Sequence, residues 1–538
     1  MHIEFNEPRG GAMESLGLDG IASARDRPFF SARAVASGVQ TQGTPHCQLG
    51  HVLPDHAGHG HDGIFVRWDW DGQRLTVQND RYGIYPLFYS HFGGEIRISP
   101  AIQHVLDGDF PKGLNYPGLA VFLRLGFFLA DDTPFEHVHF LPPGSRLIWQ
   151  QGKLELNRGS LEAPRPSAMP QTFDETVEAY QELFRQAIER RPPSETGYHL
   201  ALSGGRDSRH IFLELLYQGH KPRSVVTVQG PPPIDNEDVL LASQLAQATD
   251  VDHRVVRYEG SYVASVLKDA ELTSHCSAPH TWLIALAASF GKADTKCIYD
   301  GLAGDVLSGA HQVSPEKLAL MRAGRTRELA NLLLREANQE AAIKACHRSA
   351  LVERIPESLA VERIITEMEQ HRDASSPLQS FVFWNRTRRG IGLLPFGLLA
   401  HVKTVYCPYL DHDLFDFLMN VNPDYSMKKA FHDETINRAF PKLSDIPFEA
   451  ADATPPTYEE IRRHYRACAQ GTMRDILRRP QQFLSSPLVR PGRFTAMVLR
   501  TSLTRSPDKP WYLQPGLRAV ELGRLSEPQN VNHPANPD

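Results

Sequence analysis

The spacing of hydrophobic positions along the chain changes near residue 160. Before that point, short apolar runs have the two-residue period of strands and are separated by turn residues. This pattern predicts one helix over 115–125 and strands at 63–70, 74–80, 86–90, 95–99 and 146–149. Asp71 and Gly72 lie between the first two strands, and this pair favours a tight hairpin. We therefore expect an antiparallel, β-rich domain of the α+β class over residues 1–160.

After a linker rich in Pro, Ala and Ser over 161–172, the hydrophobic positions take a helical period. Tyr180, Phe184 and Ile188 would share one face of a helix. Apolar runs then alternate with helical stretches, which favours a doubly wound parallel sheet of the α/β class. The expected elements are strands at 198–202, 224–228 and 254–256 and a helix over 236–249. We expect this domain, over 173–480, to end in a helical C-terminal part.

The remaining residues, 481–538, are rich in Pro, Arg and Ser, and we expect a partly disordered C-terminal extension there.

Composition excludes several function classes. The net charge of −6 over 538 residues gives no basic surplus for binding nucleic acid. No apolar run is long enough to cross a membrane, and the N-terminus lacks a secretion pattern, so we expect a cytoplasmic protein without a membrane partner. Six scattered cysteines show no CxxC spacing, which argues against a zinc site. The histidine-rich segment 56–61 lies among turn residues, and we interpret it as a loop.

The candidate chemistry begins where the strand 198–202 ends at Leu202. The next residues are Ser203, Gly204, Gly205, Arg206, Asp207 and Ser208. Two glycines permit a sharp turn, and serine hydroxyls with the free N–H groups of a helix start form an anion site. The carboxylate of Asp207 is suited to a divalent cation that bridges phosphates, although an N-cap of the helix is the alternative. The Gly-Lys-Ser/Thr ending of the Walker A loop is missing.

Four segments together resemble the asparagine synthetase superfamily. Residues 80–99 resemble a class II glutamine amidotransferase domain, which has an Ntn-hydrolase-like fold. Residues 203–208 resemble the pyrophosphate loop of the N-type ATP pyrophosphatases, and residues 299–309 resemble the second Gly-rich loop of the family. Residues 406–438 resemble the C-terminal Pro-Phe-Leu-Asp segment and the lysine after it.

The resemblance implies a function for individual residues. ATP and Mg²⁺ would be the cofactors, with Asp207 and Asp305 as magnesium ligands, although Asp305 could instead be a turn residue. The nucleotide would be bound by Leu202, Ser203, Gly204, Gly205, Ser208, Val228 and Gly301. Lys429, or its neighbour Lys428, would stabilise charge in the amide-forming step, and the alternative is a solvated surface pair.

Three arginines, Arg386, Arg388 and Arg389, stand where relatives place basic residues near the active site, although a solvated helix face is the alternative.

Two departures from the family pattern narrow the expected reaction. Glutaminase domains of this class use an N-terminal cysteine, whereas position 2 is His2 and the first cysteine is Cys47. We therefore expect no glutamine hydrolysis. Leu302 occupies a position that holds Glu in asparagine synthetases and Tyr in β-lactam synthetases, and leucine is neither acid nor base.

What remains resembles the macrolactam synthetases of lasso-peptide biosynthesis. We expect an AMP-forming amide synthetase that joins a side-chain carboxylate of a precursor peptide to its N-terminal amine, with a leader peptidase as partner protein. A small-molecule amide or lactam synthetase, acting on a free carboxylate and amine, and a catalytically inactive scaffold remain the alternatives.

Overall fold

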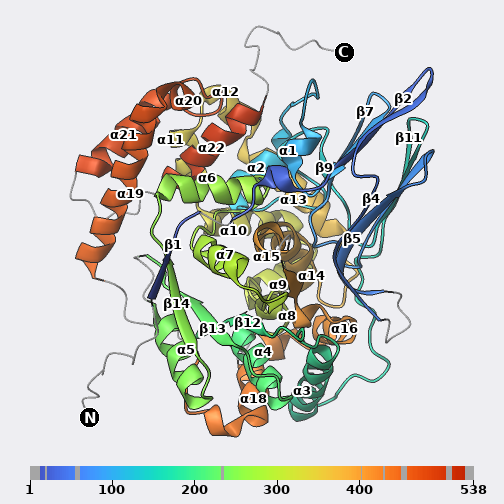
Figure 1. Cartoon of the computed structure of the whole chain (residues 1–538), viewed down its shortest axis with the longest axis vertical. Helices are drawn as coiled ribbons and strands as arrows, with labels where there is room; N and C mark the ends of the chain where they lie inside the picture. Colours follow the sequence, from blue (N-terminus) through green and yellow to red (C-terminus); the bar gives the residue numbers. More distant parts are fainter. Residues whose placement is uncertain are drawn as a thin grey trace.

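The computed structural model describes residues 13–18, 21–54, 61–231, 236–400, 403–427, 430–449, 457–503 and 512–526. Two antiparallel sheets lie at one end of the molecule and one parallel sheet at the other, with helices between and around them (Figure 1). The predicted combination of an antiparallel β-rich domain with a parallel α/β domain is confirmed.

The N-terminal lobe, residues 21–157, contains two five-stranded antiparallel sheets. One has the order β11 (Lys153–Asn157), β10 (Arg146–Gln150), β6 (Arg74–Asn79), β5 (Asp62–Trp70), β4 (His46–Leu53). The other has the order β3 (Gly38–Gly43), β2 (Phe30–Val35), β8 (Glu95–Ser99), β7 (Phe88–Phe92), β9 (His139–Phe140). The rings of Phe30 and Trp70 lie 5.7 Å apart and join the two sheets into a sandwich.

Three short helices complete the lobe: η1 (Ala24–Asp26), α1 (Ile102–Val105) and α2 (Tyr116–Leu125). The predicted strand at 86–90 begins two residues later, at Phe88, because Pro86 has no N–H to donate to a neighbouring strand.

The parallel sheet has six strands in the order β1 (Met13–Leu16), β14 (His253–Tyr258), β13 (Ser224–Val228), β12 (Tyr198–Ala201), β15 (Cys297–Tyr299), β16 (Thr404–Tyr406). From β12 the chain adds β13 and β14 on one side and later β15 and β16 on the other. The order therefore reverses between β12 and β15. Ligands bind beside the carboxyl ends of strands at such a switch point.

Helices cover both faces of this sheet in Figure 1. They include α3 (Phe173–Glu189), α4 (Arg206–Tyr217), α5 (Glu237–Ala248), α7 (Leu283–Lys292), α16 (His412–Asn420) and α18 (Ala430–Ala439). Of the two other helices, α17 (Pro423–Ser426) packs on α18, and α6 (Tyr262–Leu272) packs against the C-terminal helices. Shorter turns are α8 (Gly304–Leu307), η3 (Pro408–Leu410) and η4 (Pro441–Leu443).

A helical region follows β15, as the sequence pattern predicts. It contains α9 (Pro315–Arg322), α10 (Thr326–Ala337), α11 (Glu340–Cys346), α12 (Ser349–Arg354), α13 (Glu357–Glu369), α14 (Pro377–Phe381), the π-helix η2 (Val382–Ile391) and α15 (Leu393–Leu398).

The C-terminal residues are more ordered than their composition suggests. They form α19 (Tyr458–Arg478), α20 (Pro480–Leu484), α21 (Pro491–Leu503) and α22 (Leu513–Leu525). Pro480 and Pro491 are each the first residue of a helix, where the missing N–H of proline has no cost. Most of residues 481–503 and 512–526 is helical, whereas residues 504–511 and 527–538 lie outside the described part of the chain, so the expected partial disorder stays a prediction.

One strand joins the sheet from an unexpected place. β1 comes from the start of the described chain, within the residues that we assigned to the first domain, yet it pairs in parallel with β14. Glu14, which faces Val256 in this pairing, also forms an ion pair with Arg254. The first described residues therefore lie on the sheet of the second domain, and the chain then enters the N-terminal lobe.

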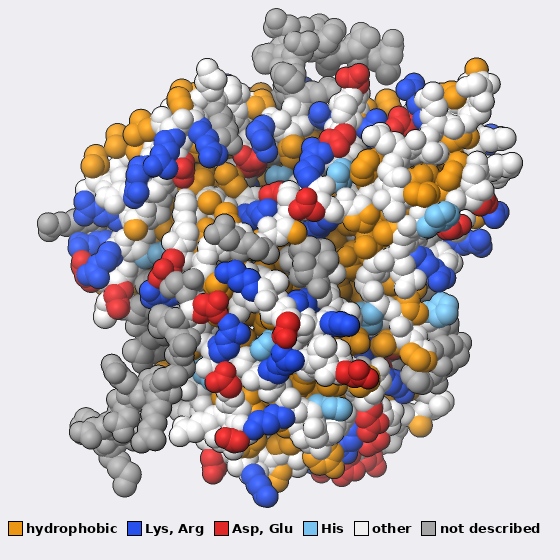
Figure 2. Space-filling view, in the orientation of Figure 1, with side chains coloured by type: hydrophobic (Ala, Val, Ile, Leu, Met, Phe, Trp, Pro, Cys, Tyr) orange, Lys and Arg blue, Asp and Glu red, His pale blue; other side chains and the backbone are white. Residues whose placement is uncertain are grey.

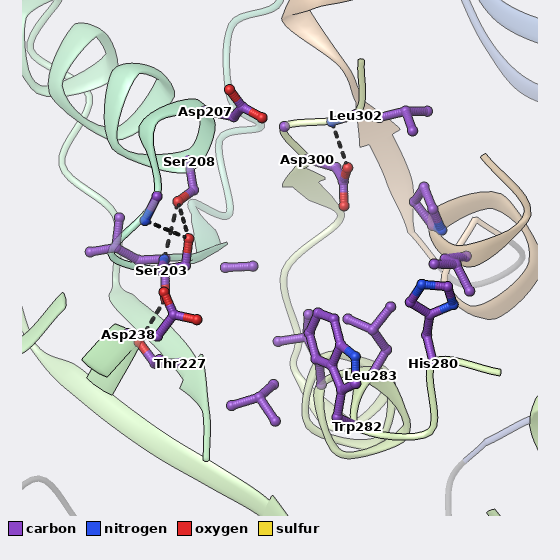
Figure 3. A pocket seen from close by; sticks show the side chains of 18 of the residues that line it. Ser203, Asp207, Ser208, Thr227, Asp238, His280, Trp282, Leu283, Asp300 and Leu302 are labelled. Atoms are coloured by element: carbon purple, nitrogen blue, oxygen red, sulfur yellow. Dashed lines mark hydrogen bonds between the residues drawn. The ribbon is translucent and has the colours of Figure 1, made fainter. Parts of the chain in front are cut away.

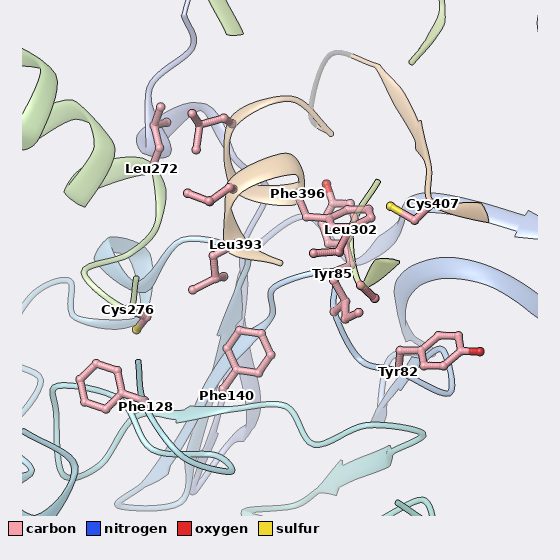
Figure 4. Packing of buried hydrophobic residues seen from close by; sticks show 14 of the residues in the cluster. Tyr82, Tyr85, Phe128, Phe140, Leu272, Cys276, Leu302, Leu393, Phe396 and Cys407 are labelled. Carbon is pink, nitrogen blue, oxygen red and sulfur yellow. The ribbon is translucent and has the colours of Figure 1, made fainter. Parts of the chain in front are cut away.

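The N-terminal lobe is tied to the rest of the molecule by two buried arginines of the π-helix. Arg388 donates to the carbonyl oxygens of Tyr82 at 3.0 Å and Leu141 at 2.6 Å, and Arg389 donates to that of Ala130 at 2.8 Å. Beside them, hydrophobic residues from both parts of the chain pack together (Figure 4). Both arginines thus face the lobe, neither the site nor solvent.

On the surface, acidic and basic side chains are intermingled over the parallel-sheet half of the face in Figure 2. The C-terminal helices, at the upper left, expose Leu477, Leu484, Leu499 and Leu503. No helix within the described residues is both long and apolar enough to cross a membrane.

Candidate functional site

The loop after β12 has the geometry expected of an anion site. The hydroxyl of Ser203 lies 3.0 Å from that of Ser208 and accepts a hydrogen bond from the N–H of Gly205 at 3.1 Å. Gly205 is the N-cap of α4, so the first N–H groups of this helix point toward the loop. Gly204 donates to Asp238 Oδ1 at 2.7 Å, which fixes the loop against the start of α5.

Asp207 lies in the first turn of α4 and faces the loop after β15. A Cβ atom on Gly304 would lie 2.5 Å from Asp207 Cγ, and one on Gly301 would lie 2.8 Å from Asp207 Cβ. Glycine is therefore required at both positions for the two loops to meet. Asp207 accepts a hydrogen bond from the backbone N–H of Asp305, and Gly205 occupies the N-cap position, so the N-cap alternative for Asp207 is wrong.

The two carboxyl groups repel each other. Burial and the nearby Asp305 carboxylate hold the pKa of Asp207 well above its usual range. Asp305 lies in the first turn of α8, and its side chain is 45% exposed, 3.5 Å from Arg386 Nη1. Two hard oxygen donors that face each other beside an anion loop suit Mg²⁺, which needs few protein ligands when phosphates supply the rest. The residues present therefore fit this ion.

Between these loops lies a cavity of about 640 Å³. Of the residues predicted to bind nucleotide or metal, Leu202, Ser203, Gly205, Asp207, Ser208, Val228, Gly301 and Asp305 line it. Gly204 does not, because it packs behind the loop against Leu241. Figure 3 shows Ser203, Ser208 and Asp238 on one side, with Asp300, Leu302, His280 and Trp282 across the cavity.

The predicted lysines could not be tested. Lys428 and Lys429 both lie outside the described residues, directly before α18. Among the described residues that line the cavity, Arg206 is the only lysine or arginine, and it forms an ion pair with Asp433 of α18.

Of the three arginines near the π-helix, only Arg386 reaches a site residue, Asp305. The prediction that Arg388 and Arg389 lie at the active site is wrong. The π-helix, with its wider turn, directs them to the N-terminal lobe.

A buried histidine, His432, lies beside Asp207 and Ser308. His432 Nδ1 lies 3.0 Å from Ser308 Oγ and 3.6 Å from Asp207 Oδ1. Ser308 donates its own proton to the carbonyl of Gly304 at 2.7 Å, so the imidazole N–H donates toward Ser308. The sequence analysis missed this contact, because His432 lies 225 positions after Asp207 and in no recognisable motif.

Two titratable side chains face the far part of the cavity. Asp300 Oδ1 accepts the N–H of Leu302 at 2.8 Å, and burial raises the pKa of Asp300 to about 6. His280 donates from Nδ1 to the carbonyl oxygen of Ala278 at 2.8 Å, which leaves the lone pair on Nε2. Burial lowers the pKa of His280, so the ring is neutral near pH 7. His280 lies in a loop without a motif, so only the structure identifies it.

Comparisons with known proteins agree with this arrangement. Residues 55–158 match the model of a glutamine amidotransferase domain, and residues 179–440 match that of asparagine synthase.

Individual proteins match parts of this chain at 25–28% sequence identity. The amidase chyE of Penicillium rubens is 25% identical over 268 residues, which cover 46% of this chain and 39% of that protein. The amidase chry2 of Gibberella zeae is 25% identical over 267 residues, with the same two shares. The glutamine-hydrolysing asparagine synthetase 3 of Bacillus subtilis is 28% identical over 155 residues, 28% of this chain and 25% of that protein. The chain thus spans at most about two fifths of the length of these relatives.

The two matched models cover more than half of the chain and occur in the order amidotransferase, then synthase. Their order agrees with the antiparallel lobe and the parallel sheet, and the site lies in the second. The chain is a member of the asparagine synthetase superfamily.

Proposed function

We propose that this protein is an ATP-dependent, AMP-forming carbon–nitrogen ligase. A substrate carboxylate attacks the α-phosphorus of ATP and releases pyrophosphate, and an amine then attacks the acyl-adenylate and releases AMP. The main support is that Asp207 and Asp305 lie next to each other in the lining of one cavity, at the switch point of a parallel sheet. Mg²⁺ held by these two carboxylates would neutralise phosphate charge.

Residues of the chain have separate tasks in this reaction. The hydroxyl groups of Ser203 and Ser208, with the N–H groups at the start of α4, bind the pyrophosphate. Leu202 and Val228, at the ends of β12 and β13, bind the adenine ring. Lys429 or Lys428 remains the proposed cation for the amide-forming step.

The amine must lose a proton before or during its attack. Leu302 has no proton acceptor, so another side chain has to supply one. Nε2 of His280 carries a lone pair and belongs to the cavity wall. We assign His280 as the general base.

The substrate that we favour is a lasso-type precursor peptide, whose side-chain carboxylate and N-terminal amine would be joined into a macrolactam ring. A leader peptidase would free the amine. One observation supports an amine donor other than ammonia from glutamine. The residues that match the amidotransferase model, 55–158, include no cysteine.

The test is ATP–pyrophosphate exchange by the purified protein with Mg²⁺, with and without the precursor peptide encoded beside its gene. We expect exchange that depends on the peptide, together with a product that has lost one water. Exchange with a free amino acid alone would indicate a small-molecule amide synthetase. No exchange with any carboxylate would overturn the ligase function and leave an inactive scaffold.

A further inference from the structure

Opposite the loop at 203–208, which we call the phosphate loop, the cavity is lined by five large apolar side chains together with His280 and Asp300. Trp282, Leu283 and Leu286 come from the loop before α7 and from its first turn, and Leu394 and Leu398 come from α15. In Figure 3, Trp282 and Leu283 lie across the cavity from Ser203 and Ser208. We call these five residues the apolar wall.

Trp282 is the exposed part of this wall. Its side chain belongs to the cavity lining, yet the residue is 41% exposed, whereas Leu394 and Leu398, which also line the cavity, are 4% and 3% exposed. An accessible indole in the same cavity as these leucines is a favourable surface for an apolar group, because binding removes apolar surface from water.

Leu302 continues the apolar surface toward the interior. It is 4% exposed and lines the cavity. Figure 4 shows Leu302 beside Phe396 of α15 and Tyr85 of the N-terminal lobe. A carboxylate or hydroxyl at this position would point into an apolar cluster, so the surroundings of Leu302 match its side chain.

The nucleotide does not need this wall. Leu202, Val226 and Val228, on the side of the phosphate loop, provide a separate apolar surface for a base. The apolar wall is therefore left for the acyl substrate.

The charges of the cavity disfavour a free amino acid. The α-carboxylate of aspartate or glutamate needs a cation or several N–H donors when it is removed from water. In the described lining the only arginine, Arg206, is paired with Asp433 beside the phosphate loop, and His280 is neutral near pH 7. Against Trp282 and the leucines, an α-carboxylate would lose its hydration and meet no unpaired arginine or lysine among the described lining residues.

We propose that the apolar wall binds a large aliphatic or aromatic side chain next to the reacting carboxylate, so that the acyl substrate is a peptide with such a neighbour and not a free acidic amino acid. This inference rests on the proposed ligase function. It adds to that function the kind of side chain that the site recognises beside the reacting carboxylate.

The experiment uses capped dipeptides that contain aspartate or glutamate preceded by Leu, Trp or Ser, together with free aspartate and free glutamate. ATP–pyrophosphate exchange is measured for the full-length protein with each. We expect exchange at least tenfold faster with Leu or Trp than with Ser, and none with the free amino acids. Equal rates for all dipeptides, or preference for a free amino acid, would overturn the inference.

Two variants locate the effect. Trp282→Ser and Leu398→Ser should reduce the preference for Leu over Ser to about twofold or less and leave the KM for ATP unchanged, because the phosphate loop is untouched. Leu477→Ser, on an exposed position of α19, is the matched control and should keep the preference. If both wall variants kept the preference for the Leu dipeptide over the Ser dipeptide, the apolar wall would not be the surface that recognises this side chain.

Calorimetric binding of the same dipeptides separates this inference from the proposed function. If no substrate supports exchange, yet the Leu and Trp dipeptides bind at least tenfold more tightly than the Ser dipeptide and lose that preference in Trp282→Ser, the wall is correct and the ligase function is wrong. If exchange is absent and binding shows no such preference, both are wrong.

Discussion

Each of the two parts of this molecule has an aspartate after a β-strand, and the two carboxylates differ in their surroundings. In the N-terminal lobe, Asp80 follows β6, is 2% exposed, and accepts N–H groups from Phe65 at 2.9 Å and Tyr82 at 2.8 Å. In the parallel-sheet domain, Asp207 follows β12 and lies beside the carboxylate of Asp305 in the lining of the cavity. A carboxylate satisfied by internal donors stabilises a turn, whereas one that faces a like charge is held for a ligand.

The largest expected effect on activity comes from changing Asp207, whose carboxylate lines the cavity. Asp207→Asn should lower pyrophosphate exchange by about 10²–10³-fold or more, because a charge that stabilises the transition state is lost. The same change should raise the melting temperature, since the raised pKa of Asp207 reflects the burial of its charge and the repulsion by Asp305, both of which the neutral amide removes. Exchange kinetics and calorimetry test both. Asp250→Asn, at a fully exposed carboxylate, is the control. Normal exchange in Asp207→Asn would remove Asp207 from the site.

The next effect concerns the proposed base. His280→Gln should lower the rate of amide formation by about 10²-fold and leave pyrophosphate exchange nearly unchanged, because adenylation precedes the amine step. Burial lowers the pKa of His280, so the wild-type rate of amide formation should persist below the pH at which a free histidine gains its proton, about 6.5. A pH–rate profile of the amine step measures this.

In the His280→Gln variant the acidic limb of that profile should disappear. The exposed His311, changed to Gln, should keep it. If exchange and amide formation fell equally in His280→Gln, the residue would act in binding and would not be the base.

A third change addresses the junction between the two parts. Arg388→Met should destabilise the protein by roughly 3 kcal/mol or more, because the buried carbonyl groups of Tyr82, Gly83 and Leu141 lose their donor. We expect the wild type to unfold in one calorimetric transition and the variant in two, with the N-terminal lobe melting first. Arg372→Met, at a side chain that is 75% exposed, should change nothing. An unsplit transition with an unchanged midpoint would show that the junction does not depend on Arg388.

Local patterns predicted most of this architecture. Strand β8 has the predicted bounds because Glu95–Ser99 alternates strictly, and the loop at 203–208 is recognisable as a candidate anion site because its residues are consecutive. Contacts between distant segments were not predictable in this way. The pairing of β1 depends on β14, about 240 residues away, and the π-helix turns Arg388 toward carbonyl groups that have no sequence pattern. Trp282 and His280 lie in a loop, where periodicity carries no information.

A smaller effect is expected at the closed carboxylate of the lobe. Asp80→Asn should cost about 1–3 kcal/mol, because the amide NH₂ would face one of the backbone N–H groups that the carboxylate now accepts. Exchange should remain normal below the melting temperature. Denaturant unfolding compares this variant with Asp109→Asn, at an exposed position of the same lobe. A loss of exchange without a loss of stability would mean that Asp80 takes part in the chemistry.

No effect is expected at the one cysteine of the N-terminal lobe. Cys47 lies on β4, and burial raises the pKa of its thiol to about 11, so the thiolate that glutamine hydrolysis requires is nearly absent at pH 7. Cys47→Ser should therefore alter neither exchange nor the release of glutamate from glutamine, which we expect to be at background in both proteins. Glutamate release by the wild type that disappears in Cys47→Ser would make the lobe a second active site, and the contrast between a closed lobe and an open synthetase site would fail.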